Sequence, residues 1–183
     1  MKKRLMSLGL AMVLTISTIA MITGCGEKEP GKEPATSYQI VLGFVNADYV
    51  NTGDEKLTKI IDVETEATFP SERDMYLQAI ELLRESNMAK VQDGVKDNLT
   101  TAYYDRYQIN DIVVEDSLAT VDFDGEYLTG SSLQESMLIS QIVETLTKSF
   151  DQIMSVKFTV NGEEAETLFG HIDLTQEFGE KIL

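Results

Sequence analysis

The sequence has few of the residue types on which cross-linked, metal-dependent and sugar-binding proteins rely. Its 183 residues include one cysteine, one histidine, three prolines and no tryptophan. A single cysteine excludes an internal disulfide framework, so packing alone has to stabilise the core, which is feasible at this length. The absence of tryptophan removes an aromatic platform that sugar-binding sites commonly use.

Basic residues are also scarce, with 15 Lys and Arg against 31 Asp and Glu and a formal net charge of −16. Nucleic-acid binding requires Lys and Arg to neutralise phosphates, so this balance argues against it. It argues equally against a protein that lies flat on anionic lipid. The charge is typical of a soluble extracellular domain, and a basic binding partner remains an alternative.

The N-terminus has the three parts of an export signal. Lys2, Lys3 and Arg4 precede an apolar stretch over residues 5–22, and small residues follow before a single cysteine. The sequence predicts a signal peptide over residues 1–24. An uncleaved transmembrane helix and an exported free thiol are the alternatives.

The segment Ile22-Thr23-Gly24-Cys25 resembles the lipobox of bacterial lipoproteins. The resemblance implies cleavage before Cys25 and a diacylglyceryl thioether on its sulfur. Two acyl chains anchor a protein stably, whereas one gives marginal binding. We therefore expect a cell-membrane protein that is lipid-anchored on the extracytoplasmic face.

Residues 25–37 follow as a polar segment with two prolines and alternating charges, which is typical of a flexible tether. Residues 38–183 then form one domain. Removal of the signal peptide removes three basic residues, so the mature chain keeps 12 basic and 31 acidic residues and a charge of −19.

The domain alternates between extended and helical patterns. Strands are expected over residues 38–45, 57–69, 107–114, 118–123 and 156–160, with a last strand near 165–169; helices are expected over residues 71–86 and 132–150. Ser132 and Glu135 fit a capping box at the second helix. Glu115-Asp116-Ser117 and Asn161-Gly162 predict tight reversals between strands. The order predicts an α+β fold, a mainly antiparallel sheet with two helices packed on one face.

Several segments resemble the GerMN domain of spore-germination, sporulation and envelope proteins. They are Val121-Asp122-Phe123, residues 135–147, residues 156–162, Gly170-His171-Ile172-Asp173-Leu174 and the strand over residues 38–49. The resemblance covers most of residues 38–178 and implies an α/β interaction module without catalytic residues. This chain holds one copy where sporulation members often carry two, so a general envelope role is equally compatible.

Three patterns raise the question of catalysis or metal binding. His171 and Asp173 lie close together, but no nucleophile motif accompanies them. Glu126 and Glu135 are the acids considered for glycoside hydrolysis. Asp122-Phe123-Asp124-Gly125-Glu126 is a fragment of a calcium loop without its later ligands. We predict no enzyme activity, no metal and no cofactor.

Tyr103, Tyr104 and Tyr107 gather beside Arg106, and tyrosine and arginine are enriched at interaction hot spots. Tyr103, Tyr104 and Arg106 are therefore the predicted interaction surface, with packing of the tyrosines as the alternative. The function predicted is a lipid-anchored, non-catalytic interaction module that binds an envelope or spore-associated protein. A solute- or wall-polymer-binding lipoprotein is the alternative. A pocket lined by several aromatic side chains would favour that alternative. A cleft with two close acids would instead favour an envelope hydrolase.

Overall fold

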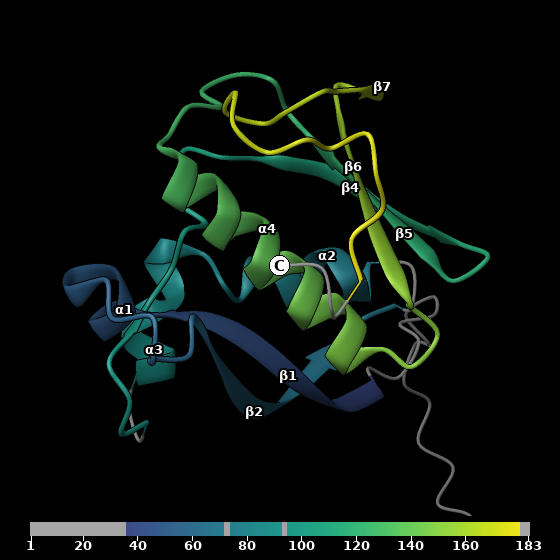
Figure 1. Ribbon diagram of the computed structural model, residues 1–183. Coiled ribbons are helices and arrows are strands. Elements are labelled where there is room, and N and C mark those ends of the chain that lie inside the picture. Colours follow the sequence, from purple (N-terminus) through teal and green to yellow (C-terminus); the bar gives the residue numbers. More distant parts are fainter. Residues whose placement is uncertain (1–35, 72–73, 93–94, 180–183) are drawn as a thin grey trace, which may run out of the picture. The chain divides into compact units, whose positions relative to one another are not determined.

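The computed structural model describes residues 36–71, 74–92 and 95–179 (Figure 1). The predicted signal peptide, Cys25 and most of the predicted tether lie outside these residues. The described elements are β1 (Thr36–Asn46), α1 (Ala47–Thr52), β2 (Ile60–Phe69), α2 (Met75–Glu81), a 3-10 helix (Glu85–Asn87), α3 (Met88–Gln92), β3 (Leu99–Thr100), β4 (Ile109–Glu115), β5 (Leu118–Phe123), α4 (Ser132–Ser149), β6 (Ser155–Val160) and β7 (Glu163–Glu164).

Sheet A has the strand order β2-β1-β3. β1 and β2 pair antiparallel along their lengths, from Thr36 opposite Phe69 to Val45 opposite Ile60. The turn between them contains α1, which the Asn46 side chain caps by accepting hydrogen bonds from the N–H groups of Asp48 and Tyr49. Both predicted extended segments are confirmed, and β1 begins two residues before the predicted start of the domain.

Sheet B has the order β4-β5-β6-β7. The predicted β4–β5 hairpin is confirmed, and its turn residues Asp116 and Ser117 have φ of 48° and 67°. The Asn161-Gly162 reversal is confirmed as well, with φ of 52° and 78°. The strand after it is β7 at residues 163–164, so the expectation of a strand over residues 165–169 is wrong.

β5 and β6 are parallel neighbours, because α4 carries the chain back along the sheet between them. The α+β class is confirmed, but the predicted single sheet is two sheets, and the described residues hold four α-helices instead of two. Nor do the helices share one face of one sheet. α4 contacts both β1 of sheet A and β6 of sheet B, and Figure 1 shows it running between the two sheets.

α4 meets β1 with a row of polar side chains at every fourth position, Gln141, Thr145 and Ser149. Ser149 Oγ accepts a hydrogen bond from the N–H of Val41 at 2.9 Å and donates one to the Val41 carbonyl at 2.9 Å. Thr145 Oγ1 accepts from the N–H of Gly43 at 2.9 Å, and Gln141 Nε2 donates to the Gly43 carbonyl at 3.1 Å. These side chains bond the backbone groups on the edge of β1 that no described strand other than the short β3 covers.

Gly43 lies where the helix crosses this strand. A Cβ atom there would stand 3.1 Å from Ile60 Cγ2 and 3.4 Å from the Gln141 carbonyl oxygen. An added Cβ would crowd Ile60 of β2 and would already be in van der Waals contact with α4, so glycine leaves room at this crossing.

Candidate interaction site

Tyr103 belongs to the core, so it drops out of the predicted interaction surface. Its side chain is 0% exposed. Its hydroxyl donates to Glu81 Oε1 at 2.7 Å and accepts from Arg84 Nη2 at 2.7 Å, and the Arg84 guanidinium lies 4.4 Å from the ring centroid. Burial, followed by the hydrogen bond to Glu81, raises the pKa of Tyr103 well above its usual value, so the group stays neutral.

Arg84 fastens the chain around this tyrosine. It forms a two-pronged ion pair with Glu81 at 2.6 Å and 2.7 Å. Its Nη1 donates to the carbonyls of Asp105 and Tyr107. The segment that carries the predicted surface is therefore fixed to the end of α2, which gives Tyr104 and Arg106 a rigid base.

Tyr104 and Arg106 do reach the surface, the first half-buried and the second exposed. The Arg106 guanidinium lies 4.8 Å from the Tyr104 ring centroid and 4.6 Å from that of Tyr107. Its Nη2 donates to Tyr107 Oη at 2.7 Å and to the Thr129 carbonyl at 3.2 Å. An exposed cation is thus held in one place by two aromatic faces and two acceptors.

A shallow depression of about 180 Å³ begins at Tyr104 and runs between α1 and the first turns of α4. We call it the α1–α4 groove. Its walls are Val45, Val50, Thr100, Thr101, Ala102, Tyr104, Ser131, Leu133, Gln134 and Met137. Val50 is 40% exposed and Leu133 is 42% exposed, although both are large apolar side chains.

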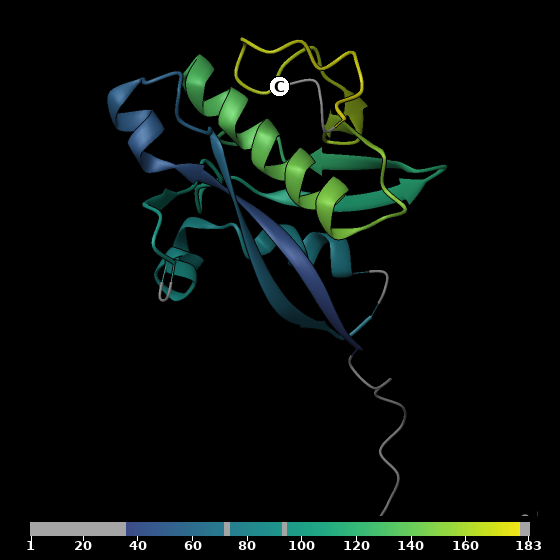
Figure 2. The same ribbon diagram turned by 60° about the horizontal axis from the view of Figure 1, so that its bottom comes forward.

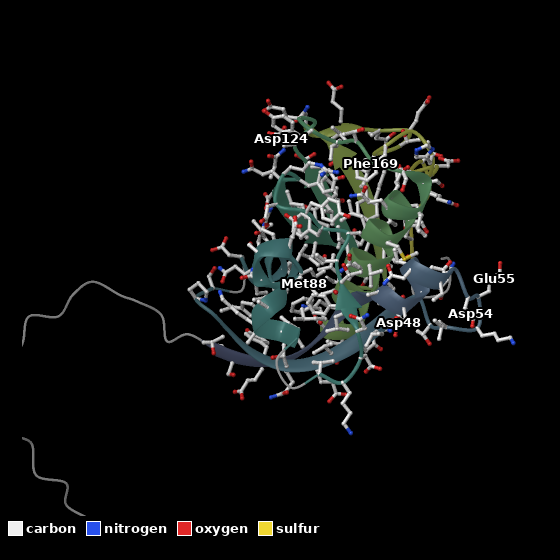
Figure 3. All side chains as sticks on the ribbon, turned by 90° about the vertical axis from the view of Figure 1, so that its left-hand side faces the viewer. Asp48, Asp54, Glu55, Met88, Asp124 and Phe169 are labelled. Carbon is white, nitrogen blue, oxygen red and sulfur yellow. The ribbon has the colours of Figure 1, made fainter. Side chains whose placement is uncertain are left out.

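The two helices that form the groove have defined starts. Asn46 caps α1, and Ser131 caps α4 by accepting from the N–H of Gln134 at 3.2 Å. The predicted capping box at Ser132 is wrong by one residue, and its acid has another role described below. Figure 3 looks onto this side of the domain, with Asp48 of α1 and Phe169 labelled.

The rim next to Arg106 is built from aromatic packing. The Tyr107 ring lies 6.0 Å from Tyr104, nearly parallel to it, and 5.2 Å from Phe169. Gly130 makes room for Phe169, because a Cβ atom there would stand 2.7 Å from its Cδ2. Tyr107, which the sequence pattern placed at the start of a strand, is buried and packs beneath Tyr104 and Arg106.

Glu135, one of the two acids considered for glycoside hydrolysis, is 0% exposed. Its carboxylate accepts from the backbone N–H groups of Leu168 and Phe169 at 2.8 Å and of His171 at 2.9 Å. It cannot flank an open groove together with exposed Glu126. Its role is to attach the C-terminal segment to α4.

The calcium-loop fragment is likewise occupied by internal hydrogen bonds. Asp122 accepts from Asn110 Nδ2, Thr159 Oγ1 and the N–H of Gly162 at 2.7–2.9 Å. Burial acts to raise the pKa of Asp122, but these hydrogen bonds outweigh it and lower the pKa below the usual value. Across the described ranges, no cluster of three or more His, Cys, Asp or Glu residues is placed to hold a metal ion.

His171 and Asp173 line an exposed depression in the C-terminal segment. Asp173 Oδ1 accepts from the N–H and hydroxyl of Thr175, and these bonds lower its pKa. Neither residue contacts a serine or cysteine in a described hydrogen bond. In the part of the chain that the structure describes, no helix is long and apolar enough to cross a membrane.

The two-sheet α+β domain with its central helix is the fold of the GerMN domain. The chain aligns with the first GerMN domain of the sporulation protein GerM from Bacillus subtilis at a TM-score of 0.58 and 18% identity, covering 79% of this chain and 98% of the other. The tandem GerMN domains of the same protein give a TM-score of 0.58 and 16% identity, over 79% of this chain and 46% of theirs.

The chain belongs to the Germane family, described as "Sporulation and spore germination", whose model matches residues 31–166. A Clostridium perfringens protein classed as a candidate lipoprotein also aligns, at a TM-score of 0.48 and 15% identity, over 80% of this chain and 88% of the other. No curated protein sequence matches this chain.

Proposed function

We propose that this protein is a lipid-anchored, extracytoplasmic and non-catalytic module that holds an envelope or spore-associated protein in the α1–α4 groove. The observation that carries the proposal is the groove itself. Exposed Val50 and Leu133 line the groove together with Tyr104, and the Arg106 guanidinium is held against the Tyr104 ring. Such a mixture of apolar, aromatic and arginine side chains is typical of binding hot spots.

The groove favours a protein over a small solute or a wall polymer. Among the described residues that line it, Tyr104 is the one aromatic side chain and none is acidic. A sugar site would need more aromatic surface, and a hydrolase would need two acids in a cleft. Membership of the Germane family supports a role in sporulation or spore germination.

The membrane part of the proposal rests on the sequence. A diacylglyceryl thioether on Cys25 would confine the domain to the membrane surface, and the tether over residues 25–37 would set its reach. Confinement raises the local concentration of the module near its partner, so a modest affinity suffices.

A photo-crosslinking amino acid at Leu133 tests the groove in living cells. The same amino acid at Met154, which is 75% exposed beyond the other end of α4, is the matched control. We expect a defined crosslinked protein from position 133 alone, and Arg106→Ala should reduce its yield. Equal products from both positions, or none from position 133, would contradict the groove as a binding site.

Mass spectrometry of the purified mature protein tests the anchor separately. The expected N-terminal peptide begins at Cys25 and carries the diacylglyceryl mass, and Cys25→Ala should release the domain from membranes. An unmodified cysteine on a cleaved, secreted chain would contradict the lipid anchor. It would not bear on the α1–α4 groove as a binding site.

A further inference from the structure

β2 is the outer strand of sheet A, and its ten residues have no strand beyond them among the described elements (Figure 2). The direction of its backbone groups follows from β1. Val41 and Gly43 direct their N–H groups away from β2, towards α4. Their partners across the ladder, Glu64 and Asp62, therefore direct N–H and C=O groups to the outside.

The outward set continues at every second residue along β2. Glu66 and Thr68 share the parity of Asp62 and Glu64, whereas Val63, Thr65 and Ala67 pair with β1. The outer edge thus offers four consecutive pairs of backbone donors and acceptors.

An apolar depression of about 290 Å³ lies against this edge on one face of the sheet. We call it the β2 groove. It runs from the β2 backbone at residues 65–69 to Gln78 and Leu82 at α2 and Val91 of α3. Because consecutive residues of β2 form its wall, the groove reaches the strand's open edge as well as its inward side chains.

The opposite face of β2 is acidic. Asp62, Glu64 and Glu66 point to that face and are exposed. Lys148 neutralises Asp62 with an ion pair of 2.8 Å, and Glu66 accepts a hydrogen bond from Ser37. No described Lys or Arg pairs with Glu64, so negative charge remains beside the unpaired backbone groups.

We propose that the open edge of β2 binds an extended basic polypeptide segment, in which Lys or Arg alternates with apolar residues, as an added strand. Side chains directly opposite each other on neighbouring strands lie on the same face. Residues opposite Glu64 and Glu66 therefore meet acids and need positive charge. The residues between them enter the β2 groove next to Leu82 and Val91.

The same geometry excludes a second copy of β2 as the occupant. Two such edges would bring Asp62, Glu64 and Glu66 against identical acids, and like charges opposite each other destabilise a strand pair. This surface is separate from the α1–α4 groove, and the inference stands whether or not the proposed function does.

The test uses the full chain in detergent micelles and a fluorescent, end-capped peptide of alternating Lys and Val residues. Fluorescence anisotropy measures its affinity, and hydrogen exchange reads out residues 60–69. We expect saturable binding and slower exchange in that segment. Binding without added protection there, or equal binding of an alternating Glu and Val peptide, would overturn the proposal.

Three variants separate backbone pairing from charge. Glu64→Pro removes an outward N–H that has no partner in sheet A, and it should weaken binding roughly tenfold or more. Glu64→Gln should weaken it less. Glu115→Lys places a larger charge change at an exposed residue at the end of β4 in sheet B and should leave the affinity close to that of wild type. If Glu115→Lys weakens binding as much as Glu64→Pro, non-specific attraction explains the data and the site is wrong.

Discussion

The free edges of β1 and β2 in sheet A differ in whether their backbone N–H and C=O groups have hydrogen-bond partners. The inner edge of β1 is closed by side chains, because Gln141, Thr145 and Ser149 of α4 supply the partners that a strand would supply. The outer edge of β2 keeps its backbone groups open and carries acids that repel a like strand. The buried polar residues of α4 therefore have a structural role. The acids of β2 keep its outer edge from pairing with a like strand, so that edge stays available to a partner.

Proline at two neighbouring positions of β2 should have the largest effect, because the two N–H groups point to opposite sides of the strand. Thr65 pairs with Ile40, so Thr65→Pro removes a ladder hydrogen bond and leaves its acceptor unsatisfied, which should lower the free energy of unfolding by about 3 kcal/mol. Glu64→Pro removes an outward N–H that sheet A does not use, so it should lower the free energy of unfolding much less. Urea unfolding followed by circular dichroism measures both, and equal losses would show that the outer edge is paired.

Loss of Gln141, the longest of the three polar side chains of α4 that bond the edge of β1, should lower the stability of the domain. Gln141 accepts from the N–H of Ala102 at 2.6 Å and donates to the Gly43 carbonyl, and it is 0% exposed. Gln141→Leu leaves both backbone groups without partners and should cost about 2–3 kcal/mol. Gln152→Leu, at an exposed site where the amide bonds Tyr76 Oη, is the control. A loss at Gln141 no larger than at Gln152 would argue against the sealing role.

Sheet B offers a smaller effect that depends on pH. Asp122 joins β4, β6 and the β6–β7 turn through its three donors, and these lower its pKa below the ordinary 3.8. A depressed folded-state pKa stabilises the fold above the unfolded pKa, and that stability is lost as pH falls through the folded pKa. The stability difference between wild type and Asp122→Asn should therefore be present at neutral pH and shrink in acid.

Thermal unfolding over a pH series measures this difference. Asp151→Asn, which removes an acid at an exposed position after α4, is the control for the loss of one negative charge. A constant gap between wild type and Asp122→Asn from neutral to acid pH would contradict the linkage.

Local patterns were sufficient for the elements that depend on local chemistry. α4 occupies residues 132–149 against the predicted 132–150, because its apolar side chains recur at helical spacing over five turns. The reversals at Asp116-Ser117 and Asn161-Gly162 follow from residues that tolerate positive φ. By contrast, α1 has six residues and α3 has five, too few for a periodic signal, and both were missed.

Residue roles at the predicted surface could not be read from spacing. Tyr103 and Tyr104 are adjacent in sequence, yet one lies under Arg84 in the core and the other lies beside Arg106 at the surface. The position of Glu135 in the sequence is equally compatible with an exposed acid that caps the helix and with a buried hydrogen-bond acceptor. No local signal separates these outcomes, because burial depends on which distant segment packs against each side chain.

Composition and neighbouring residues were enough to predict the acidic balance, the main strands, the long helix, the tight turns and the family resemblance. Tertiary structure alone decided that β5 and β6 run parallel, that α4 closes β1 while β2 stays open, and that Glu135 holds residues 168–171. Those outcomes join segments tens of residues apart. Their free energy comes from burial and hydrogen bonds that exist only once the chain has folded.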